Sequence, residues 1–254
     1  VFPAKKMTIN LAPANLPKDG SHFDVPIALA ILIASGQLPQ QSVANTLCAG
    51  ELSLSGALRP VRGIINITET AREKGFKTII VPQDNADQAA LVKDIEVIGA
   101  PTLASAYLHL TGEKRLPATP RPTSPSSPKY TTDFGDIHGQ DQAKRALTIA
   151  AAGGHNILLD GPPGAGKTML ARALVSILPN PSYEEQIAIT KLHSLVGDSI
   201  DSIASERPFR SPHHTASQIS LIGGGTKPLP GEISLAHYGV LFLDEIPEYP
   251  RSIL

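Results

Sequence analysis

The sequence has little sulfur, few aromatic rings and no excess of either charge. A single cysteine among 254 residues excludes an internal disulfide and a metal site built from several cysteines. Aromatic residues make up 4% and tryptophan is absent, which counts against a surface of stacked bases or an aromatic cage. The 22 basic and 23 acidic residues give a net charge of -1, so bulk charge cannot hold the protein on nucleic acid or a membrane.

Long apolar segments are also missing. The longest apolar run, residues 25–34, is far below the ~20 residues that a membrane-spanning helix needs. No basic-then-apolar leader opens the chain. The one cysteine, Cys48, lies in an apolar stretch and is predicted to be a small buried side chain, and a lone thiol fits a reducing compartment. We therefore expect a soluble, cytoplasmic protein without membrane contact.

Proline is concentrated in one segment. Five of the 23 prolines fall between positions 117 and 128, among Ala, Thr, Ser and Arg. Such a segment has few apolar side chains to bury and favours an extended, solvated backbone. The pattern predicts a linker at 117–129 between a domain at 1–116 and a domain at 130–254. Because the chain starts without methionine and stops abruptly at Leu254, we expect it to be part of a longer protein.

Both predicted domains alternate helical and strand patterns, which is typical of an α/β fold. The first domain has expected helices at 25–34, 67–75 and 86–92, and expected strands at 77–81 and 95–98. The second has expected helices at 140–152 and 167–178, and expected buried strands at 156–159 and 239–243.

The strongest chemical signal is a glycine-rich segment between an expected strand and an expected helix. It has the spacing of a phosphate-binding loop, and its residues are Gly161, Pro162, Pro163, Gly164, Ala165, Gly166, Lys167 and Thr168. Glycines let backbone N–H groups close around phosphate oxygens, and the following helix adds positive field. Lys167 would contact the β- and γ-phosphates of ATP, and Thr168 would bind Mg²⁺.

A second signal is an apolar run that ends in two carboxylates, Asp244 and Glu245. In open α/β sheets, ligands bind at the carboxyl ends of the strands. Asp244 would hold Mg²⁺ through its water shell, and Glu245 would polarise the attacking water as the general base. With the phosphate loop, this pair predicts ATP hydrolysis, because no acceptor site for a kinase reaction is identifiable.

These motifs together resemble an AAA+ ATPase, as do residues 136–140 and 143–147. Residues 207–215, and the glycines 223–225 followed by 230–237, are similar to the magnesium-chelatase branch of that superfamily. That branch carries an insertion in the helix before the acidic strand, which fits the long interval between the two motifs. The resemblance implies that Ile137 and His138 lie near the adenine.

The first domain is similar to the proteolytic domain of Lon in residues 16–20, 50–56 and 79–85. A Lon-like α+β domain before a chelatase-like, parallel-sheet AAA+ domain resembles the YifB/ComM family of bacterial proteins. The resemblance implies an ATP-driven motor that self-associates into a hexameric ring. It also implies DNA as a partner, because ComM acts on branched DNA during natural transformation.

The catalytic pattern of Lon is not preserved. Lon uses a serine nucleophile activated by a lysine, and the alignment puts His22 at the serine position, next to Ser21. It puts the lysine position at or near Ile67, and residues 63–70 contain no lysine. Since a serine hydroxyl without a base is a weak nucleophile, we expect a protease fold without protease activity.

Two other functions remain open: a motor subunit for metal insertion into a tetrapyrrole, and an ATP-dependent protease. His213 and His214 lack a third metal ligand at helical spacing, so we favour structural or DNA-facing loop roles for them. Arg207 and Arg210 suit a solvated loop or a phosphate contact, and residues 223–225 could form a pore loop. The resemblance places the sensor residue, lid and arginine finger beyond Leu254, so we expect this chain alone to hydrolyse ATP poorly.

Overall fold

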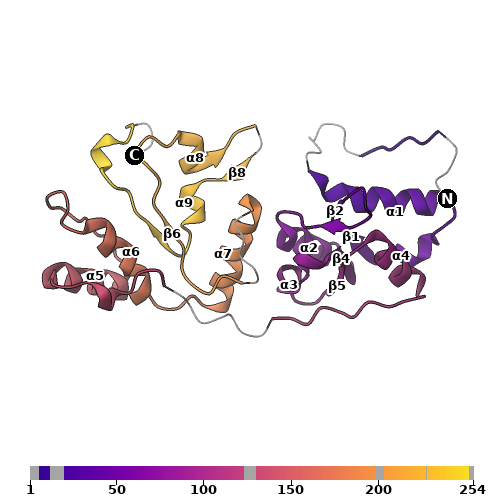
Figure 1. Ribbon diagram of the computed structural model, residues 1–254, viewed down its shortest axis with the longest axis horizontal. Helices are drawn as coiled ribbons and strands as arrows, with labels where there is room; N and C mark the ends of the chain where they lie inside the picture. Colours follow the sequence, from indigo (N-terminus) through magenta and orange to yellow (C-terminus); the bar gives the residue numbers. More distant parts are fainter. Residues whose placement is uncertain (1–5, 12–19, 123–129, 198–202, 227, 252–254) are drawn as a thin grey trace. The chain divides into compact units, whose positions relative to one another are not determined.

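The computed structural model describes residues 6–11, 20–122, 130–197, 203–226 and 228–251. The chain divides into two compact units, residues 1–123 and 124–254, called here the N-terminal and the C-terminal unit (Figure 1). Most of the expected linker, at 123–129, and most of the first Lon-like stretch, at 16–19, lie outside the described residues. Within the described residues, every helix is too short or too polar to cross a bilayer.

A parallel three-stranded sheet forms the centre of the N-terminal unit. Its order is β1 (Thr46–Cys48), β4 (Thr78–Pro82) and β5 (Glu96–Ala100). Ile80 of β4 lies opposite both Cys48 and Ile98, so the register aligns apolar side chains across all three strands. This sheet confirms the expectation of a mixed α/β fold with parallel strands.

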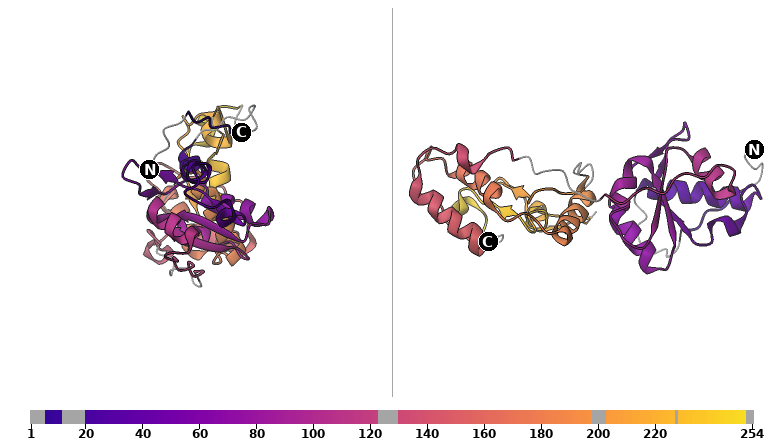
Figure 2. Two further views of the ribbon diagram at one scale, coloured as in Figure 1. Left: turned by 90° about the vertical axis from the view of Figure 1, so that its right-hand side faces the viewer. Right: turned by 90° about the horizontal axis from the view of Figure 1, so that it is seen from below.

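Helices cover the sheet on both sides (Figure 2). On one side, Ile80 and Ile98 pack in a core with Val25 and Leu29 of α1 (Asp24–Ala34) and with Ala106 of α4 (Leu103–Thr111). On the other side lies α3 (Ala86–Ala89), which also packs against α2 (Ile64–Glu73). Gly99 allows this approach, because a Cβ atom there would lie 2.9 Å from the Ala86 methyl group.

Short elements complete the N-terminal unit. They are η1 (Ser21–Phe23), η2 (Gln40–Val43), η3 (Gln83–Asn85) and the antiparallel pair β2 (Glu51–Leu52) and β3 (Leu58–Arg59). Helix α2 begins three residues earlier than expected, because Gly63 takes a left-handed backbone (φ 67°) and starts the helix directly after it. Ala118 bridges Ile98, and the Thr119 amide donates to the Val97 carbonyl (2.8 Å), so the chain follows the edge of β5 up to that point.

The C-terminal unit is built around two packed helices, α5 (Asp141–Gly153) and α6 (Lys167–Ile177). Leu147 of α5 and Leu170 and Leu174 of α6 bury their side chains together with Ile137. The other helical elements are η4 (Phe134–Asp136), α7 (Tyr183–Val196), α8 (Gln218–Ile222), α9 (Glu232–Leu235) and η5 (Ile246–Glu248). Among its described residues, β6 (Phe209–Arg210) pairs with β9 (Val240–Leu241) in parallel, and β7 (Gly223–Gly224) pairs with β8 (Leu229–Pro230) in antiparallel orientation.

The buried strand expected at 156–159 is wrong for this structure. The segment has no regular secondary structure, and Leu158 is 78% exposed. A strand forms only where a neighbour completes the hydrogen-bond ladder, and no other strand in the described residues lies beside this segment. Of the buried strand expected at 239–243, only Val240–Leu241 pair as β9, and they are partly buried. A bond from the Phe242 N–H to the Arg210 carbonyl (2.8 Å) continues the pairing.

Candidate functional site

The predicted phosphate loop is a turn that leads directly into α6. Gly166 occupies the N-cap of the helix with a left-handed backbone (φ 82°), and Gly164 is also left-handed (φ 79°). Residues with a Cβ adopt this conformation at a cost, which explains glycine at both positions. The first amides of an α-helix have no acceptor within the helix, so those at the start of α6 can donate to an anion.

Lys167 folds back over this loop. Its Nζ donates to the carbonyl oxygens of Gly161 (2.7 Å) and Pro162 (3.1 Å). The ammonium group is therefore held directly above the loop by neutral oxygens. A phosphate oxygen is a stronger acceptor for this ammonium group than a carbonyl, because it carries charge.

The acidic pair meets the phosphate loop. The Thr168 hydroxyl donates to Asp244 Oδ2 (3.3 Å), although the two residues are 76 positions apart. The other oxygen of Asp244, Oδ1, accepts the amide of Glu245 (3.1 Å). The structure thus brings together the hydroxyl and the carboxylate that we predicted for Mg²⁺.

These groups fit Mg²⁺ by their chemistry, since it prefers hard oxygen ligands and keeps several waters. Among the described residues, no cluster of three His, Cys, Asp or Glu side chains could hold a metal ion unaided. Thr168 and Asp244 would therefore share the ion with water and with nucleotide phosphates.

Glu245 is held by a residue to which sequence reasoning gave no catalytic role. Its carboxylate Oε2 lies 3.2 Å from Nδ1 of His214, in the loop after β6. Glu245 also adopts a left-handed backbone (φ 52°), an uncommon state for a residue with a side chain and one that clusters at functional sites. No strand was expected at 209–210, so the sequence carried no signal for this contact.

The two residues predicted to lie near the adenine differ in exposure. Ile137 is buried in the core of α5 and α6, and its carbonyl accepts a bond from Lys144 Nζ. His138 is exposed. Gln140 ties this segment to the loop by donating from Nε2 to the Ala165 carbonyl (3.3 Å).

Arg207 and Arg210 form ion pairs in the structure. Arg207 contacts Glu185 (3.0 Å) and also donates to the carbonyls of Pro179 and Tyr238 (both 2.7 Å). Arg210 pairs with Glu232 (2.6 Å). Both arginines therefore connect secondary-structure elements of this unit. The glycine run at 223–225 begins the β7–β8 hairpin.

In the N-terminal unit, the Ser21 hydroxyl donates to the carboxylate of Glu51, and the ring of His22 packs against Phe23 with centroids 4.0 Å apart. Ile67 is a partly buried apolar residue of α2. A carboxylate can accept the serine proton in a hydrogen bond, but it lacks the lysine chemistry of Lon.

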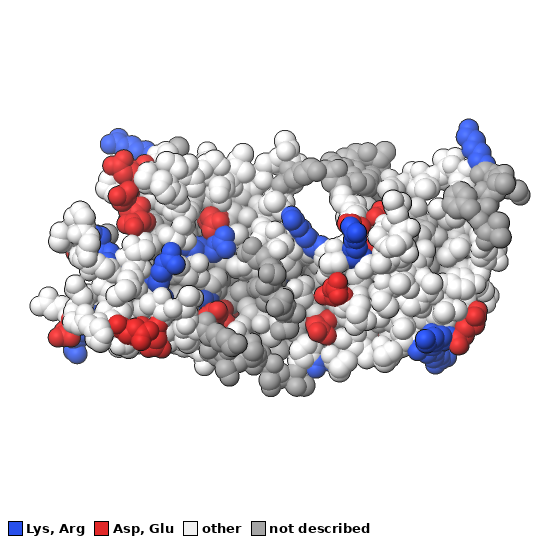
Figure 3. Space-filling view, viewed as in Figure 1, with Lys and Arg blue, Asp and Glu red and all other residues white. Residues whose placement is uncertain are grey.

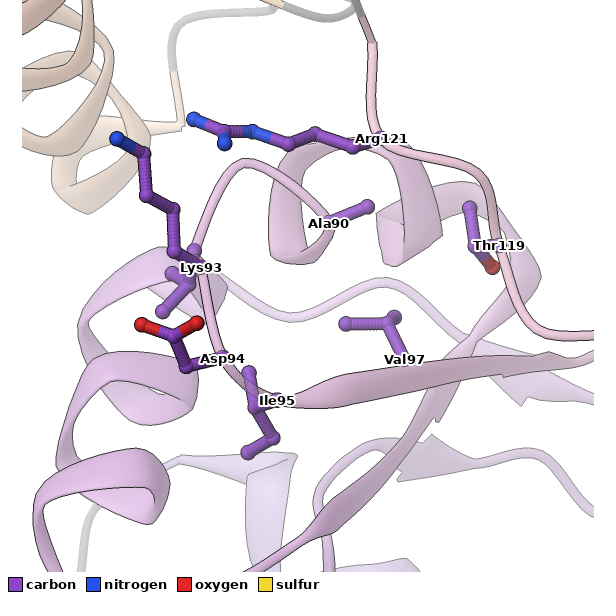
Figure 4. Close-up of a pocket in the computed structure, with 8 residues that line it drawn as sticks. Ala90, Lys93, Asp94, Ile95, Val97, Thr119 and Arg121 are labelled. Carbon is purple, nitrogen blue, oxygen red and sulfur yellow. The ribbon is translucent and has the colours of Figure 1, made fainter.

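A cavity of about 290 Å³ lies between the loop after α3, strand β5 and the chain near Thr119. The charged ends of Lys93 and Arg121 lie on the same side of it, with the carboxylate of Asp94 nearby (Figure 4). It contains none of the residues predicted for catalysis or nucleotide binding.

Comparison with known proteins finds matches in both units. The family model described as "Magnesium chelatase, subunit ChlI" matches residues 133–254, and that described as "Subunit ChlI of Mg-chelatase" matches residues 1–85. YifB of Escherichia coli (strain K12) is 49% identical over 254 residues, covering 100% of this chain and 50% of YifB. Competence protein ComM of Haemophilus influenzae is 48% identical over 258 residues, again with 100% and 50% coverage.

The similarity to Lon is partial. Lon protease 2 of Bacillus subtilis is 33% identical over 87 residues, which are 34% of this chain and 15% of the protease. The chain spans about half the length of the curated relatives that match all of it. These matches, together with the phosphate loop and the acidic pair that meets it, show that the chain belongs to the YifB/ComM family of magnesium-chelatase-like AAA+ ATPases.

Proposed function

We propose that the chain is the ATP-binding and ATP-hydrolysing module of a ring-forming motor that remodels or translocates DNA. The observation that carries the ATPase part is the contact of Thr168 with Asp244, because it joins the helix of the phosphate loop to the acidic pair. Family membership supports the same activity.

Each residue has a distinct role in the proposed reaction. The amides of the loop and Lys167 bind and orient the phosphates, and Lys167 exchanges its two carbonyl acceptors for phosphate oxygens. Thr168 and Asp244 would hold Mg²⁺, which would supply charge neutralisation of the phosphates. Glu245 orients a water and accepts its proton as the water oxygen bonds to the γ-phosphorus. The bond between that phosphorus and the β–γ bridging oxygen breaks, and ADP leaves with the electron pair.

The DNA part of the proposal rests on the family and on the name of a relative, a competence protein. On the face shown in Figure 3, acidic and basic side chains are interspersed, and neither sign forms a continuous surface. Together with a net charge of -1, this argues against DNA binding by a broad basic surface. It favours binding through a few groups that are repeated around a ring.

The test is steady-state ATP hydrolysis with Mg²⁺, with and without forked DNA, and with DNA binding at low salt. We expect Lys167→Ala to lose nucleotide binding, and Glu245→Gln to bind nucleotide but turn over at least ~100-fold more slowly. Lys74→Ala, an exposed lysine of the N-terminal unit, is the control. Wild-type turnover in Glu245→Gln would refute the assignment of the base. Equal rates with and without DNA, and no DNA binding, would refute the DNA substrate.

A metal-insertion motor is the second candidate, because both matching family models carry the name of a chelatase subunit. It predicts that the protein supports Mg²⁺ insertion into a porphyrin when mixed with the remaining chelatase subunits. We expect no such support.

We also propose that the N-terminal unit does not hydrolyse peptides, since Ser21 contacts Glu51 and residues 63–70 contain no lysine to activate it. Casein hydrolysis that disappears in Ser21→Ala would contradict this.

A further inference from the structure

The cavity beside β5 combines apolar walls with charged side chains at its rim. Its volume is about 290 Å³, and all of its lining residues belong to the N-terminal unit. Ala90, Val92, Ile95 and Val97 supply the apolar side chains. Pockets for small ligands commonly pair an apolar lining with a few polar groups that fix the orientation of the ligand. The cavity lies at the lower end of their ~300 to 1,000 Å³ range, so it suits a small ligand.

Two segments that are held on β5 enclose the cavity. Residues 90–95 connect α3 to β5, and Asp94 takes a left-handed backbone (φ 61°) just before the strand. Facing this loop, the Thr119 amide donates to the Val97 carbonyl (2.8 Å), which fixes the chain beside the strand. Arg121 follows two residues later. The charged side chains of both segments therefore start from backbone that the sheet holds in place.

The charged ends of Lys93 and Arg121 lie on the same side of the cavity (Figure 4). One comes from the loop and the other from the chain beside β5. Two cations on one side favour an anion, and the planar fork of a guanidinium matches the oxygens of phosphate. A phosphate monoester carries between one and two negative charges near neutral pH, since its second pKa is ~6. It therefore gains more from this pair than a singly charged carboxylate does.

The carboxylate of Asp94 at the same rim restricts the ligand further (Figure 4). It repels an anion next to it, but it accepts a hydrogen bond from a hydroxyl group. A ligand that carries a hydroxyl beside its phosphate satisfies both kinds of charge. The eight lining residues include no aromatic ring, so the base stacking used by single-strand-binding surfaces is not available in this cavity.

We propose that the cavity binds a small phosphate monoester that carries a hydroxyl group. Lys93 and Arg121 contact the phosphate, and Asp94 accepts from the hydroxyl. Such an ester occurs in free nucleotides and also at the phosphorylated end of a DNA strand. The site goes beyond the proposed ATPase, because none of its residues belongs to the phosphate loop or the acidic pair. A bound phosphate would also tie the chain at Arg121 to the loop at Lys93.

The main test measures binding to the whole chain carrying Lys167→Ala, which removes nucleotide from the phosphate loop. By calorimetry at low salt, we expect saturable binding of deoxythymidine monophosphate and at least ~10-fold weaker binding of thymidine, which lacks the phosphate. Lys93→Gln and Arg121→Gln should each weaken binding of the nucleotide ~10-fold. Lys74→Gln, which removes an exposed lysine that does not line the cavity, is the matched control and should leave the affinity unchanged.

A variant of Asp94 should change the affinity in the opposite direction. Asp94→Asn removes the negative charge from the rim, and asparagine tolerates the left-handed backbone of this position. It should strengthen binding of inorganic phosphate at least about threefold, because the repulsion is gone. The proposal is wrong if no saturable binding is seen, if thymidine binds as tightly as the nucleotide, or if Lys93→Gln and Arg121→Gln leave the affinity unchanged.

Oligonucleotides distinguish the two sources of the ester. A thymidylate trinucleotide is compared with and without a 5′-phosphate. A free nucleotide as the ligand predicts that deoxythymidine monophosphate binds at least as tightly as the phosphorylated trinucleotide. A DNA end predicts that the phosphorylated trinucleotide binds more tightly than either the mononucleotide or the unphosphorylated trinucleotide. Either result supports the site when Lys93→Gln weakens the binding, and insensitivity to Lys93→Gln counts against it.

Chemical labelling locates the ligand without reference to affinity. Saturating deoxythymidine monophosphate should slow the acetylation of Lys93 by an amine reagent, measured by mass spectrometry, and leave that of Lys74 unchanged. Equal acetylation of Lys93 with and without the nucleotide would overturn the proposal. Lack of ATP hydrolysis by the wild type would refute the proposed function and leave this result as it is, because the two sites share no residue.

Discussion

At the scale of single residues, the C-terminal unit places its charged groups in pairs that span elements. Arg207 connects the start of α7 to the chain before β9 through Glu185 and the Tyr238 carbonyl. Arg210 of β6 connects to Glu232 at the start of α9. Such pairs fix the positions of short strands that have few ladder hydrogen bonds of their own.

The single thiol gives a residue-scale prediction. Cys48 is partly buried against the core of α1 and β4, and desolvation raises the pKa of its thiol from 9.0 to about 12. We expect the native protein at pH 8 to react with a disulfide reagent at least ~100-fold more slowly than the urea-unfolded chain, because the thiolate is the nucleophile.

The same pKa shift predicts the direction of a pH effect. The folded state favours the neutral thiol, so this contribution to stability is present below pH 9 and is lost as the pH rises toward 12. Cys48→Ala is the control for both measurements. Equal reaction rates for folded and unfolded chains would contradict the prediction.

At the scale of elements, the capping box of helix α7 also makes a tertiary contact. The Ser182 hydroxyl accepts the Glu185 amide (3.3 Å), and Glu185 Oε2 accepts the Ser182 amide (2.7 Å), which is a capping box. Arg207 then binds the same carboxylate, so the cap of α7 also holds the segment before β6. The capping box can be predicted from the sequence, whereas the contact of Glu185 with Arg207 depends on the fold.

The cap gives an element-scale prediction for pH. The Ser182 amide, and then Arg207, hold the pKa of Glu185 below its usual value of 4.5. The carboxylate therefore contributes stability above pH 4.5 that is lost as the pH falls through its lower folded pKa. Urea midpoints measured from pH 6 to about 3 should fall more for wild type than for Glu185→Gln.

The matched control for this prediction is Glu184→Gln, which changes an exposed carboxylate in the same helical turn. It should keep the wild-type pH dependence. A Glu185→Gln variant whose midpoint falls as steeply as that of wild type would contradict the assigned role of the cap.

At the scale of the whole molecule, each unit has its own core. One is centred on the β1–β4–β5 sheet and the other on α5 and α6. Hydrophobic cores of this kind are the basis of independent folding.

Because each unit has its own core, we expect each to fold and unfold independently of the other. A protein consisting of residues 1–122 should unfold in a cooperative thermal transition of its own and keep the burial of Cys48, measured by slow thiol reaction. Residues 130–254 should likewise retain nucleotide binding that depends on Lys167. Loss of cooperative unfolding in both pieces, with a single transition in the whole chain, would contradict this.

The phosphate loop and the acidic pair could be predicted from sequence because their chemistry is local. Glycines at 164 and 166 are required by backbone angles, and Lys167 and Thr168 follow at fixed spacing. The apolar run at 156–159 was misassigned for the opposite reason. An apolar pattern indicates that a segment can form a strand, but the strand itself needs a neighbour.

The sequence by itself thus determined the kinds of groups available: a loop that fits phosphate, two carboxylates after an apolar strand, and one thiol in an apolar segment. The tertiary structure decided which of them meet. The contact of Thr168 with Asp244 and that of His214 with Glu245 depend on how α6, β6 and β9 are placed. Residues distant in the chain become neighbours only when packing and strand register fix the elements that carry them.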